Sequence, residues 1–302
     1  MSLLVVGSVA YDAIETPFGK VERTLGGAAT YSALAASHFT KVHLVGVVGD
    51  DFSAADSDIL TSRRIDIAGL ERAAGKSFFW SGRYSENFNE RTTLVTDLNV
   101  FADFRPKLPE HYRDSPYIFL ANIDPTLQRD VLKQARKKPK LVTLDTMNYW
   151  IERTPDELRE TLRHTNVLMI NDSETRQLSS EHNLLRAARH IFKLGPRTLI
   201  IKRGEYGAMM VHEGKAFCVP AFPLEEVNDP TGAGDSFAGG FMGYLAGRGR
   251  STTEDLKRAM VYGSVMGSFA VEQFGLDRLR RVTRREIDAR AKHFARLTQF
   301  TL

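Results

Sequence analysis

Short apolar runs alternate with amphipathic segments along most of the chain. Apolar and β-branched residues fill the ranges 2–9, 41–49, 117–122, 140–146, 166–172 and 198–204, and each run predicts a buried strand. Between the later runs, apolar residues recur at helical spacing over about ten to fifteen residues. Strands that alternate with helices in this way predict an α/β fold, in which a parallel sheet is covered by helices on both faces.

Two segments depart from this alternation. Residues 76–104 alternate aromatic or apolar with polar side chains and lack a helical period, which favours two or three antiparallel strands. Residues 12–24 form a polar excursion after the first strand. Together they predict a small β-sheet that projects from the main sheet, as a lid over a ligand or as a hairpin without a binding role; the aromatic content favours the lid. Residues 1–302 then form a single domain, completed by helices at 233–247, 253–272 and 283–298.

Composition excludes several classes of protein. The chain has 302 residues, a net charge of +4 and a single cysteine, Cys218, so it forms no internal disulfide. We expect Cys218 to be a small buried apolar residue and the protein to work in the reducing cytoplasm. No apolar run approaches the roughly 20 residues of a membrane span. The basic segment 278–297 has apolar residues at helical spacing, which indicates an amphipathic helix and not a nucleic-acid-binding one.

The stretch NDPTGAGDSFAGGFMGYLA, residues 228–246, carries the most specific chemistry. Apolar residues at helical spacing and the preceding Pro230 predict a helix that begins near Gly232 or Ala233. The first turn of a helix has free N–H groups and a partial positive charge, so it can hold a phosphate. Asp235 lies in this turn, either as an acid that complements the helix dipole or as a general base. We expect the helix terminus to keep the pKa of Asp235 low, which phosphoryl transfer tolerates.

These residues resemble the C-terminal motif of the ribokinase (PfkB) superfamily of carbohydrate and nucleoside kinases. The resemblance extends over nearly the whole chain: GGAATYSALAA and VGVVGDDF near the N-terminus, NDSE in the middle and IKRGEYGA after it are similar to other motifs of the family. It implies a ribokinase-like three-layer α/β/α sandwich with a mainly parallel sheet and a small β-sheet lid.

The resemblance also implies roles for individual residues. Asp235 would take the proton from the substrate hydroxyl, and the N–H groups of Gly232, Ala233 and Gly234 would form an anion hole. The substrate-binding residues would be Asp12, Gly26, Gly27 and Tyr31. Those that bind ATP would be Asn171, Lys202, Gly204, Glu205 and Gly207.

Cations have implied sites as well. Glu174, with Asn171, would organise Mg²⁺ through water near the ATP phosphates, and Asp229 and Thr231 match positions that bind K⁺ in many members. From spacing alone, Asn171 and Glu174 could instead cap the helix that follows them.

The expected function is therefore ATP-dependent phosphorylation of a hydroxymethyl group on a small sugar. The alternative is a nucleoside kinase of the adenosine, inosine, guanosine or cytidine type, since Tyr31 stands where sugar kinases of the family often carry Asn and the lid segment is rich in aromatic residues that could stack on a base. A sensor of nucleotides or sugars without catalysis is a further alternative. The expected partners are small molecules, with a homodimer through the lid as an option, and neither nucleic acid nor membrane.

Overall fold

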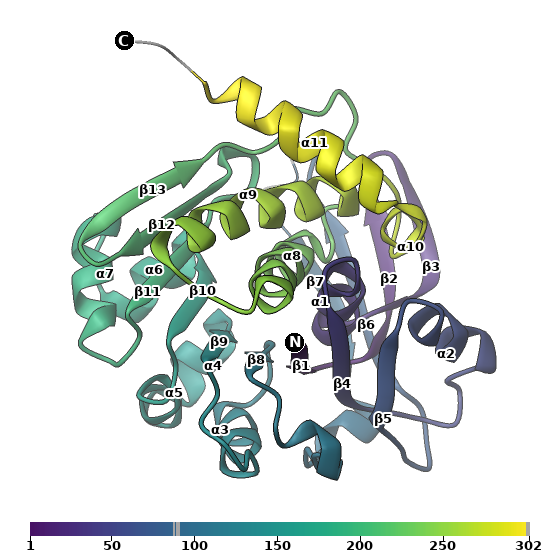
Figure 1. Ribbon diagram of the computed structural model, residues 1–302. Coiled ribbons are helices and arrows are strands. Elements are labelled where there is room, and N and C mark those ends of the chain that lie inside the picture. The colour runs from purple at the N-terminus through teal and green to yellow at the C-terminus, as the bar shows by residue number, and fades with distance from the viewer. Residues whose placement is uncertain (87, 89–90, 300–302) are drawn as a thin grey trace.

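A nine-stranded sheet runs through the centre of the protein (Figure 1). The structure is a computed structural model that describes residues 1–86, 88 and 91–299; residues 87 and 89–90 of the expected lid, and 300–302 of the expected domain, lie outside the described residues. In spatial order the strands are β13 (Lys215–Val219), β12 (Ala208–His212), β11 (Thr198–Lys202), β10 (Val167–Asn171), β9 (Leu141–Asp145), β8 (Tyr117–Leu120), β1 (Ser2–Val6), β4 (Lys41–Val48) and β5 (Ile65–Arg72). All neighbours from β11 to β5 are parallel, and β12 and β13 form an antiparallel edge.

Helices cover both faces of this sheet, as the apolar pattern predicts. One apolar cluster lies between the sheet and α1 (Ala28–Ser37), α2 (Ala54–Thr61), α8 (Ala233–Arg248), α9 (Thr253–Ala270), α10 (Asp277–Arg281) and α11 (Arg284–Leu297). A second lies between the other face and α3 (Pro125–Lys133), α4 (Asn148–Arg153), α5 (Pro155–Leu162), α6 (Asp172–Ser179) and α7 (Leu184–Phe192). Short 3₁₀ turns are η1 (Asn99–Asp103), η2 (Glu110–Tyr112) and η3 (Gly204–Tyr206). The predicted three-layer α/β/α arrangement is confirmed.

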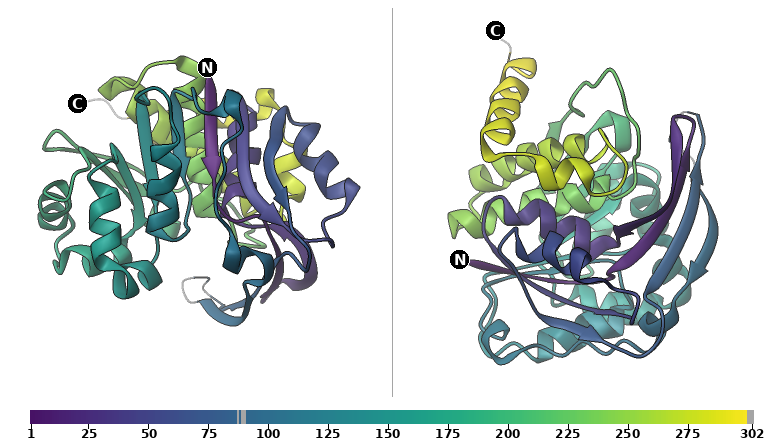
Figure 2. Two further views of the ribbon diagram at one scale, coloured as in Figure 1. Left: turned by 90° about the horizontal axis from the view of Figure 1, so that it is seen from below. Right: turned by 90° about the vertical axis from the view of Figure 1, so that its right-hand side faces the viewer.

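A second, four-stranded sheet curves along one side of the molecule, as the right-hand view of Figure 2 shows. Its strands are, in order, β3 (Gly19–Gly26), β2 (Ala10–Thr16), β6 (Phe78–Tyr84) and β7 (Arg91–Asp97). The predicted small sheet is therefore confirmed, and it differs from the expectation in one respect. The two hairpins are antiparallel, but the β2–β6 pair that joins them is parallel.

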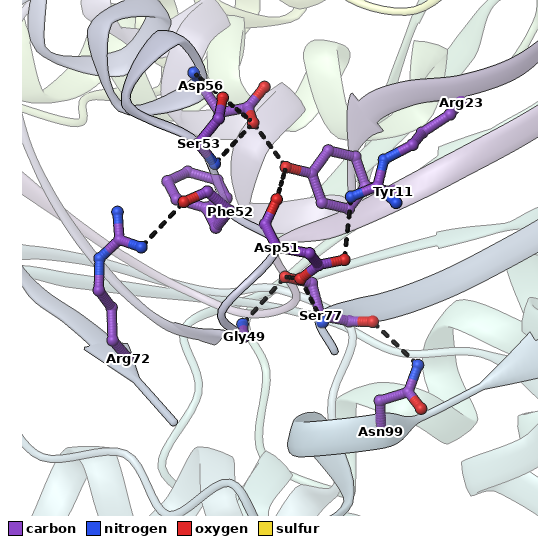
Figure 3. A network of polar contacts seen from close by, with 10 residues as sticks. All are labelled: Tyr11, Arg23, Gly49, Asp51, Phe52, Ser53, Asp56, Arg72, Ser77 and Asn99. Atoms are coloured by element: carbon purple, nitrogen blue, oxygen red, sulfur yellow. Dashed lines mark hydrogen bonds and ion pairs between the residues drawn. The ribbon is translucent and has the colours of Figure 1, made fainter. Parts of the chain in front are cut away.

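A polar network fastens the base of the small sheet to the main domain (Figure 3). The Tyr11 hydroxyl donates to the Asp56 carboxylate at 2.5 Å, and the Arg23 guanidinium lies 3.6 Å from the centre of the Tyr11 ring. Asp51 pairs with Arg23 at 2.9 Å and accepts hydrogen bonds from the N–H and hydroxyl of Ser77. Both chain segments that enter the lid are thus tied to the loop between β4 and α2.

Helix α8 is packed on two sides by other helices, which explains its internal glycines. A Cβ at Gly239 would overlap the carbonyl oxygen of Ser32 in α1, and one at Gly243 would lie 2.7 Å from the Ala36 Cα. On another side, a Cβ at Gly240 would lie 2.8 Å from the Met266 side chain in α9. Glycine lowers the helix propensity at these positions, but it allows α1 and α9 to pack closely against α8.

The cysteine of the chain lies at the surface. Cys218 is exposed, so the prediction that it is buried is wrong. It lies in edge strand β13, where Phe217 and Val219 face the protein and the alternate positions face solvent. Among the helices of the described residues, none combines the length and the apolar content needed to cross a membrane.

Candidate active site

Several of the expected site residues lie at the carboxyl edge of the parallel sheet, where the small sheet contacts the main domain. Asp145, Asn171 and Lys202 are the last residues of the neighbouring strands β9, β10 and β11. The lid contacts the loop that leads into α8, because Thr16 donates to the Asn228 carbonyl at 3.0 Å and Thr231 donates to the Tyr84 hydroxyl at 3.1 Å. In open parallel sheets, this edge is where ligands bind.

The first turn of α8 presents unpaired amides. The N–H groups of Gly232, Gly234 and Asp235 donate to no other residue in the described part of the chain, whereas the Ala233 N–H donates to the Pro230 carbonyl at 3.2 Å. Of the three amides predicted to form an anion hole, those of Gly232 and Gly234 are available, the Ala233 amide is already used, and the amide of Asp235 is available in addition. Free donors at a helix terminus form a site that an anion can occupy.

Tyr31 shapes this turn from below. Gly232 has φ 72°, and a Cβ there would overlap the Tyr31 ring, so the position requires glycine. The Tyr31 side chain is only 1% exposed. The ring of Tyr31 therefore supports the glycine turn, and its contact with a substrate stays a prediction.

Asp235 is half-buried at the start of α8. Burial, followed by repulsion from Asp145, raises the pKa of Asp235 to about 6, while Lys202 and Arg91 act to lower it. The expectation of a low pKa is therefore wrong, because desolvation of the carboxylate outweighs the favourable helix terminus. A carboxylate with this pKa is ionised at neutral pH and accepts a proton more readily than an exposed aspartate.

Asp12 lies in strand β2 of the small sheet, within electrostatic range of Asp229 and Asp235. A Cβ at Gly26 would overlap the Asp12 carboxylate, and the Gly27 N–H donates a hydrogen bond to it. Burial, with repulsion from Asp229, raises the pKa of Asp12 to about 7. Gly26 therefore leaves room for a desolvated carboxylate, and Gly27 donates a hydrogen bond to it. A hydroxyl group that donates to this carboxylate would stabilise it further.

Lys202, at the end of β11, forms an ion pair within the site. Its ammonium lies 2.7 Å from the Asp145 carboxylate, and a Cβ at Gly234 would be 3.4 Å from the Lys202 Nζ. Burial acts to lower the pKa of Lys202, but Asp145, Glu174 and Asp235 together raise it. Asp145 was missed by sequence reasoning, although an acid at the end of a parallel strand is the signal that could have identified it.

Asn171 and Glu174 form a capping box at the start of α6. The Asn171 side chain accepts from the Glu174 N–H at 2.8 Å, and the Glu174 carboxylate accepts from the Asn171 N–H at 2.8 Å. Burial raises the pKa of Glu174 to about 7. The capping interpretation therefore holds, and it leaves a desolvated carboxylate near Lys202 whose second oxygen can face a ligand.

The η3 turn lies between β11 and β12. Gly204 has φ 53° with open space around its Cα, and Glu205 follows it. Gly207 has φ 82°, and a Cβ there would overlap the backbone of Val219. Gly204 is thus open to a ligand, whereas Gly207 is required for contact between neighbouring strands.

Asp229 organises the loop before α8. Its carboxylate accepts from the Thr231 N–H at 2.8 Å and from the Gly275 N–H at 2.9 Å, and its side chain is fully buried. Two hydrogen bonds from Asn228 to the loop after α9 support the same junction. These hydrogen bonds already hold the loop in place. A monovalent cation bound by the oxygen atoms here would therefore only add to that support. In the described part of the chain, no three His, Cys, Asp or Glu side chains form a direct metal site.

Comparison with known proteins agrees with this architecture. A family model described as pfkB family carbohydrate kinase matches residues 1–280. A cytidine kinase of Thermococcus kodakarensis is 33% identical over 258 residues, which span 82% of this chain and 90% of that protein. The crystal structure of a nucleoside kinase from Methanocaldococcus jannaschii superposes with a TM-score of 0.76 at 21% identity, covering 97% and 98% of the two chains. An aminoimidazole riboside kinase from Salmonella enterica, complexed with aminoimidazole riboside and an ATP analogue, has a TM-score of 0.77 at 21% identity, covering 96% of this chain and all of that one.

A helix terminus with free amides beside a half-buried carboxylate is an arrangement that can hold a phosphate group. The chain belongs to the pfkB family of carbohydrate kinases, with the ribokinase-like fold expected from its sequence. It is a carbohydrate or nucleoside kinase, a phosphotransferase with an alcohol group as acceptor.

Proposed function

We propose that the protein transfers the γ-phosphoryl group of ATP to the 5′-hydroxymethyl group of a ribonucleoside, with cytidine as the first candidate. The carrying observation is the 33% identity to a cytidine kinase across most of both chains. It favours the nucleoside alternative over the small sugar. ATP as donor is supported by the ATP analogue bound to the Salmonella relative.

A flat aromatic surface beside Asp12 supports a nucleoside as acceptor. Trp80 pairs with Asp12 in the β2–β6 register, so the two side chains lie on the same face of the lid sheet. A Cβ at Gly82 would overlap the Trp80 indole, which shows that the indole lies flat across this glycine. Trp80 is half-buried, and its indole would contact the base while Asp12 accepts hydroxyls of the ribose.

Asp235 would act as general base in this reaction. The hydroxymethyl oxygen attacks the γ-phosphorus, its proton passes to the Asp235 carboxylate, and the bond from phosphorus to the β-phosphate oxygen breaks to release ADP. The free amides of Gly232, Gly234 and Asp235 would stabilise the charge on the transferring group. Residues 1–302 would act as one kinase domain, with the small sheet excluding water as a lid.

Two cations are proposed as well. Glu174 and Asn171 would hold Mg²⁺ through water, since Mg²⁺ retains several waters and the second Glu174 oxygen is available to them. Bound there, Mg²⁺ would neutralise phosphate charge. Asp229 and Thr231 remain the proposed site of K⁺, with a supporting effect on the loop before α8.

Assembly and location also stay proposals. The lid exposes Phe18, Leu94 and Leu98, which are 64%, 47% and 45% exposed and could pair across a homodimer. Light scattering of the wild type and of Leu94→Lys would test this, because a lid dimer would dissociate in the variant. A cytoplasmic setting remains the expectation from a single cysteine.

The acceptor is tested by a turnover screen with ATP and Mg²⁺. Cytidine, uridine, adenosine, inosine, ribose and fructose are compared by kcat/KM, with ³¹P NMR of the product to locate the phosphate. We expect a nucleoside to exceed ribose and the phosphate to be on the 5′ oxygen. Trp80→Ala should raise KM for the nucleoside more than for ribose, whereas Phe78→Ala, whose ring stacks on Phe101 at 5.3 Å, serves as control. Preference for a free sugar would overturn the nucleoside assignment.

A further inference from the structure

The motif VGVVGDDF runs from β4 into the loop before α2, and it has no part in the phosphoryl transfer described above. All three oxygen atoms of Asp51, in this loop, accept hydrogen bonds from the small sheet or from the residue that leads into it (Figure 3). Its backbone carbonyl accepts from the Tyr11 hydroxyl at 3.1 Å. One carboxylate oxygen accepts from the N–H and the hydroxyl of Ser77 at 2.8 and 2.7 Å, and the other accepts from Arg23 at 2.9 Å. Tyr11 and Arg23 belong to β2 and β3, and Ser77 directly precedes β6, so this one residue is bound to three of the four strands.

The fourth strand is joined to the same point through Ser77. The Gly49 N–H donates to the Ser77 hydroxyl at 2.9 Å, and the Asn99 side chain, two residues after β7, donates to the Ser77 carbonyl at 3.0 Å. A Cβ at Gly49 would lie 2.3 Å from the carbonyl oxygen of Gly75, so the chain that enters β6 packs directly on the end of β4. The base of the small sheet therefore meets the main domain at a compact junction around Asp51.

The residues proposed to bind the acceptor lie close to this junction along the chain. Asp12 directly follows Tyr11 in β2, and Trp80 comes three residues after Ser77, which corresponds to about 10 Å of extended chain. Successive side chains of a strand point to opposite faces, so the contacts of Tyr11 with the main domain leave Asp12 on the other face. A change in the angle of the small sheet at Asp51 would therefore move Asp12 and Trp80 together, relative to the first turn of α8.

The pair of Arg23 and Asp51 is suited to setting this angle and not to holding the fold together. The two side chains are 49% and 26% exposed, and ion pairs at such exposure contribute little to overall stability. The separate hydrogen bond from Tyr11 to Asp56, at 2.5 Å, keeps the sheet attached without the pair. Rate is more sensitive to geometry than stability is, because a misplacement of about 1 Å at a reacting group can lower the rate about 100-fold.

We propose that Asp51 is a positioning residue for the phosphoryl acceptor: its carboxylate fixes the small sheet at the angle that presents Asp12 and Trp80 to the acceptor. It acts through Arg23 on β3 and through Ser77 on β6, without touching either substrate itself. The inference rests on the acceptor contacts proposed above. Because the proposed ATP-binding residues belong to the main domain, loss of the Asp51 carboxylate weakens the use of the acceptor and leaves nucleotide binding unchanged.

The test uses Asp51→Asn, in which the amide oxygen can still accept from Ser77 but the amide nitrogen cannot accept from Arg23. Arg23→Gln and the double variant are measured beside it, because two changes within one contact should not add. Glu15→Gln is the matched control, since it also exchanges an acid for its amide in an ion pair of the small sheet, with Arg83 at 3.0 Å, but near the other end of β2. Steady-state kinetics with the best acceptor, calorimetric binding of ADP, the thermal midpoint and hydrogen–deuterium exchange without substrates are recorded for each variant.

We expect kcat/KM for the acceptor to fall by about 10- to 100-fold in Asp51→Asn and Arg23→Gln, with ADP affinity within about twofold of the wild type. The double variant should be no worse than the single ones, and Glu15→Gln should match the wild type. Deuterium uptake should rise in residues 10–26 and 78–84 but not in 141–145 or 198–202.

Unchanged acceptor kinetics in Asp51→Asn would overturn the proposal. So would an equal loss of ADP affinity with a lower thermal midpoint and faster exchange in the main sheet, which would assign Asp51 a purely structural role. If the wild type phosphorylates no acceptor, the proposed function fails and the acceptor role of Asp51 fails with it, whereas the exchange data still show whether Asp51 holds the small sheet in place.

Discussion

Replacing Asp235 with asparagine should make the protein more stable and almost inactive. The folded protein holds this half-buried carboxylate away from water, which raises its pKa from 3.8 to about 6. A raised pKa of an acid means that the folded state favours the protonated form, so ionisation at neutral pH costs stability. The difference of about two pKa units corresponds to roughly 3 kcal/mol at pH 7. Asparagine has the same shape and carries no charge, so most of this cost should disappear.

The pH dependence follows from the same shift. Below pH 3.8 the aspartic acid is protonated in both the folded and the unfolded protein, so wild type and Asp235→Asn should be equally stable. As the pH rises through the interval from 3.8 to about 6, the wild type loses stability relative to the variant. Above that interval the difference is constant, and for a chain of this length it corresponds to about 5 °C in thermal midpoint.

The assay combines thermal unfolding at several pH values with turnover. Loss of the general base should lower kcat by about 10²–10⁴, or roughly 3–5 kcal/mol in activation free energy. Asp156→Asn is the control, because Asp156 also lies in the first turn of a helix but its side chain is 86% exposed. That variant should keep full activity. Near-normal turnover of Asp235→Asn would refute the base assignment, and a midpoint that is not raised at pH 7 would refute the desolvation argument.

Three further predictions concern packing, charge and cations. Gly239→Ala should lower the free energy of unfolding by about 1–3 kcal/mol in urea titrations, because its Cβ would overlap the Ser32 carbonyl; equal or higher stability would contradict the close α1–α8 contact. Lys202→Met should cost about 3–5 kcal/mol in the same assay by leaving Asp145 unpaired, and adding Asp145→Asn should recover part of it, whereas no recovery would show that the pair is not the cause. Turnover in choline chloride should stay within about tenfold, 1.4 kcal/mol, of that in KCl, because the protein itself holds Asp229; a larger loss would make K⁺ part of the site.

The features that the sequence predicted best are those set by local pattern. The strands of the parallel sheet, the start of α8 and the position of Asp235 in its first turn follow from apolar periodicity and from proline and glycine placement. Asp145 was not predicted, because its importance depends on which strands are neighbours in the sheet. The irregularity in the β6–β7 pairing, between Ser81 and Gly82, shifts the register of β7, and no local pattern reveals such a shift.

The burial of the site carboxylates could not be predicted from local sequence pattern either, and it changes how the site works. Asp12, Glu174 and Asp235 each have a pKa raised first by burial, so the protein alone holds three carboxylates in an unfavourable environment. Each would be relieved by the group proposed for it: hydroxyls for Asp12, hydrated Mg²⁺ for Glu174 and an acceptor proton for Asp235. Desolvation of these carboxylates lowers the stability of the folded protein, and bound substrates would offset that cost. Substrate binding would therefore favour the closed position of the lid.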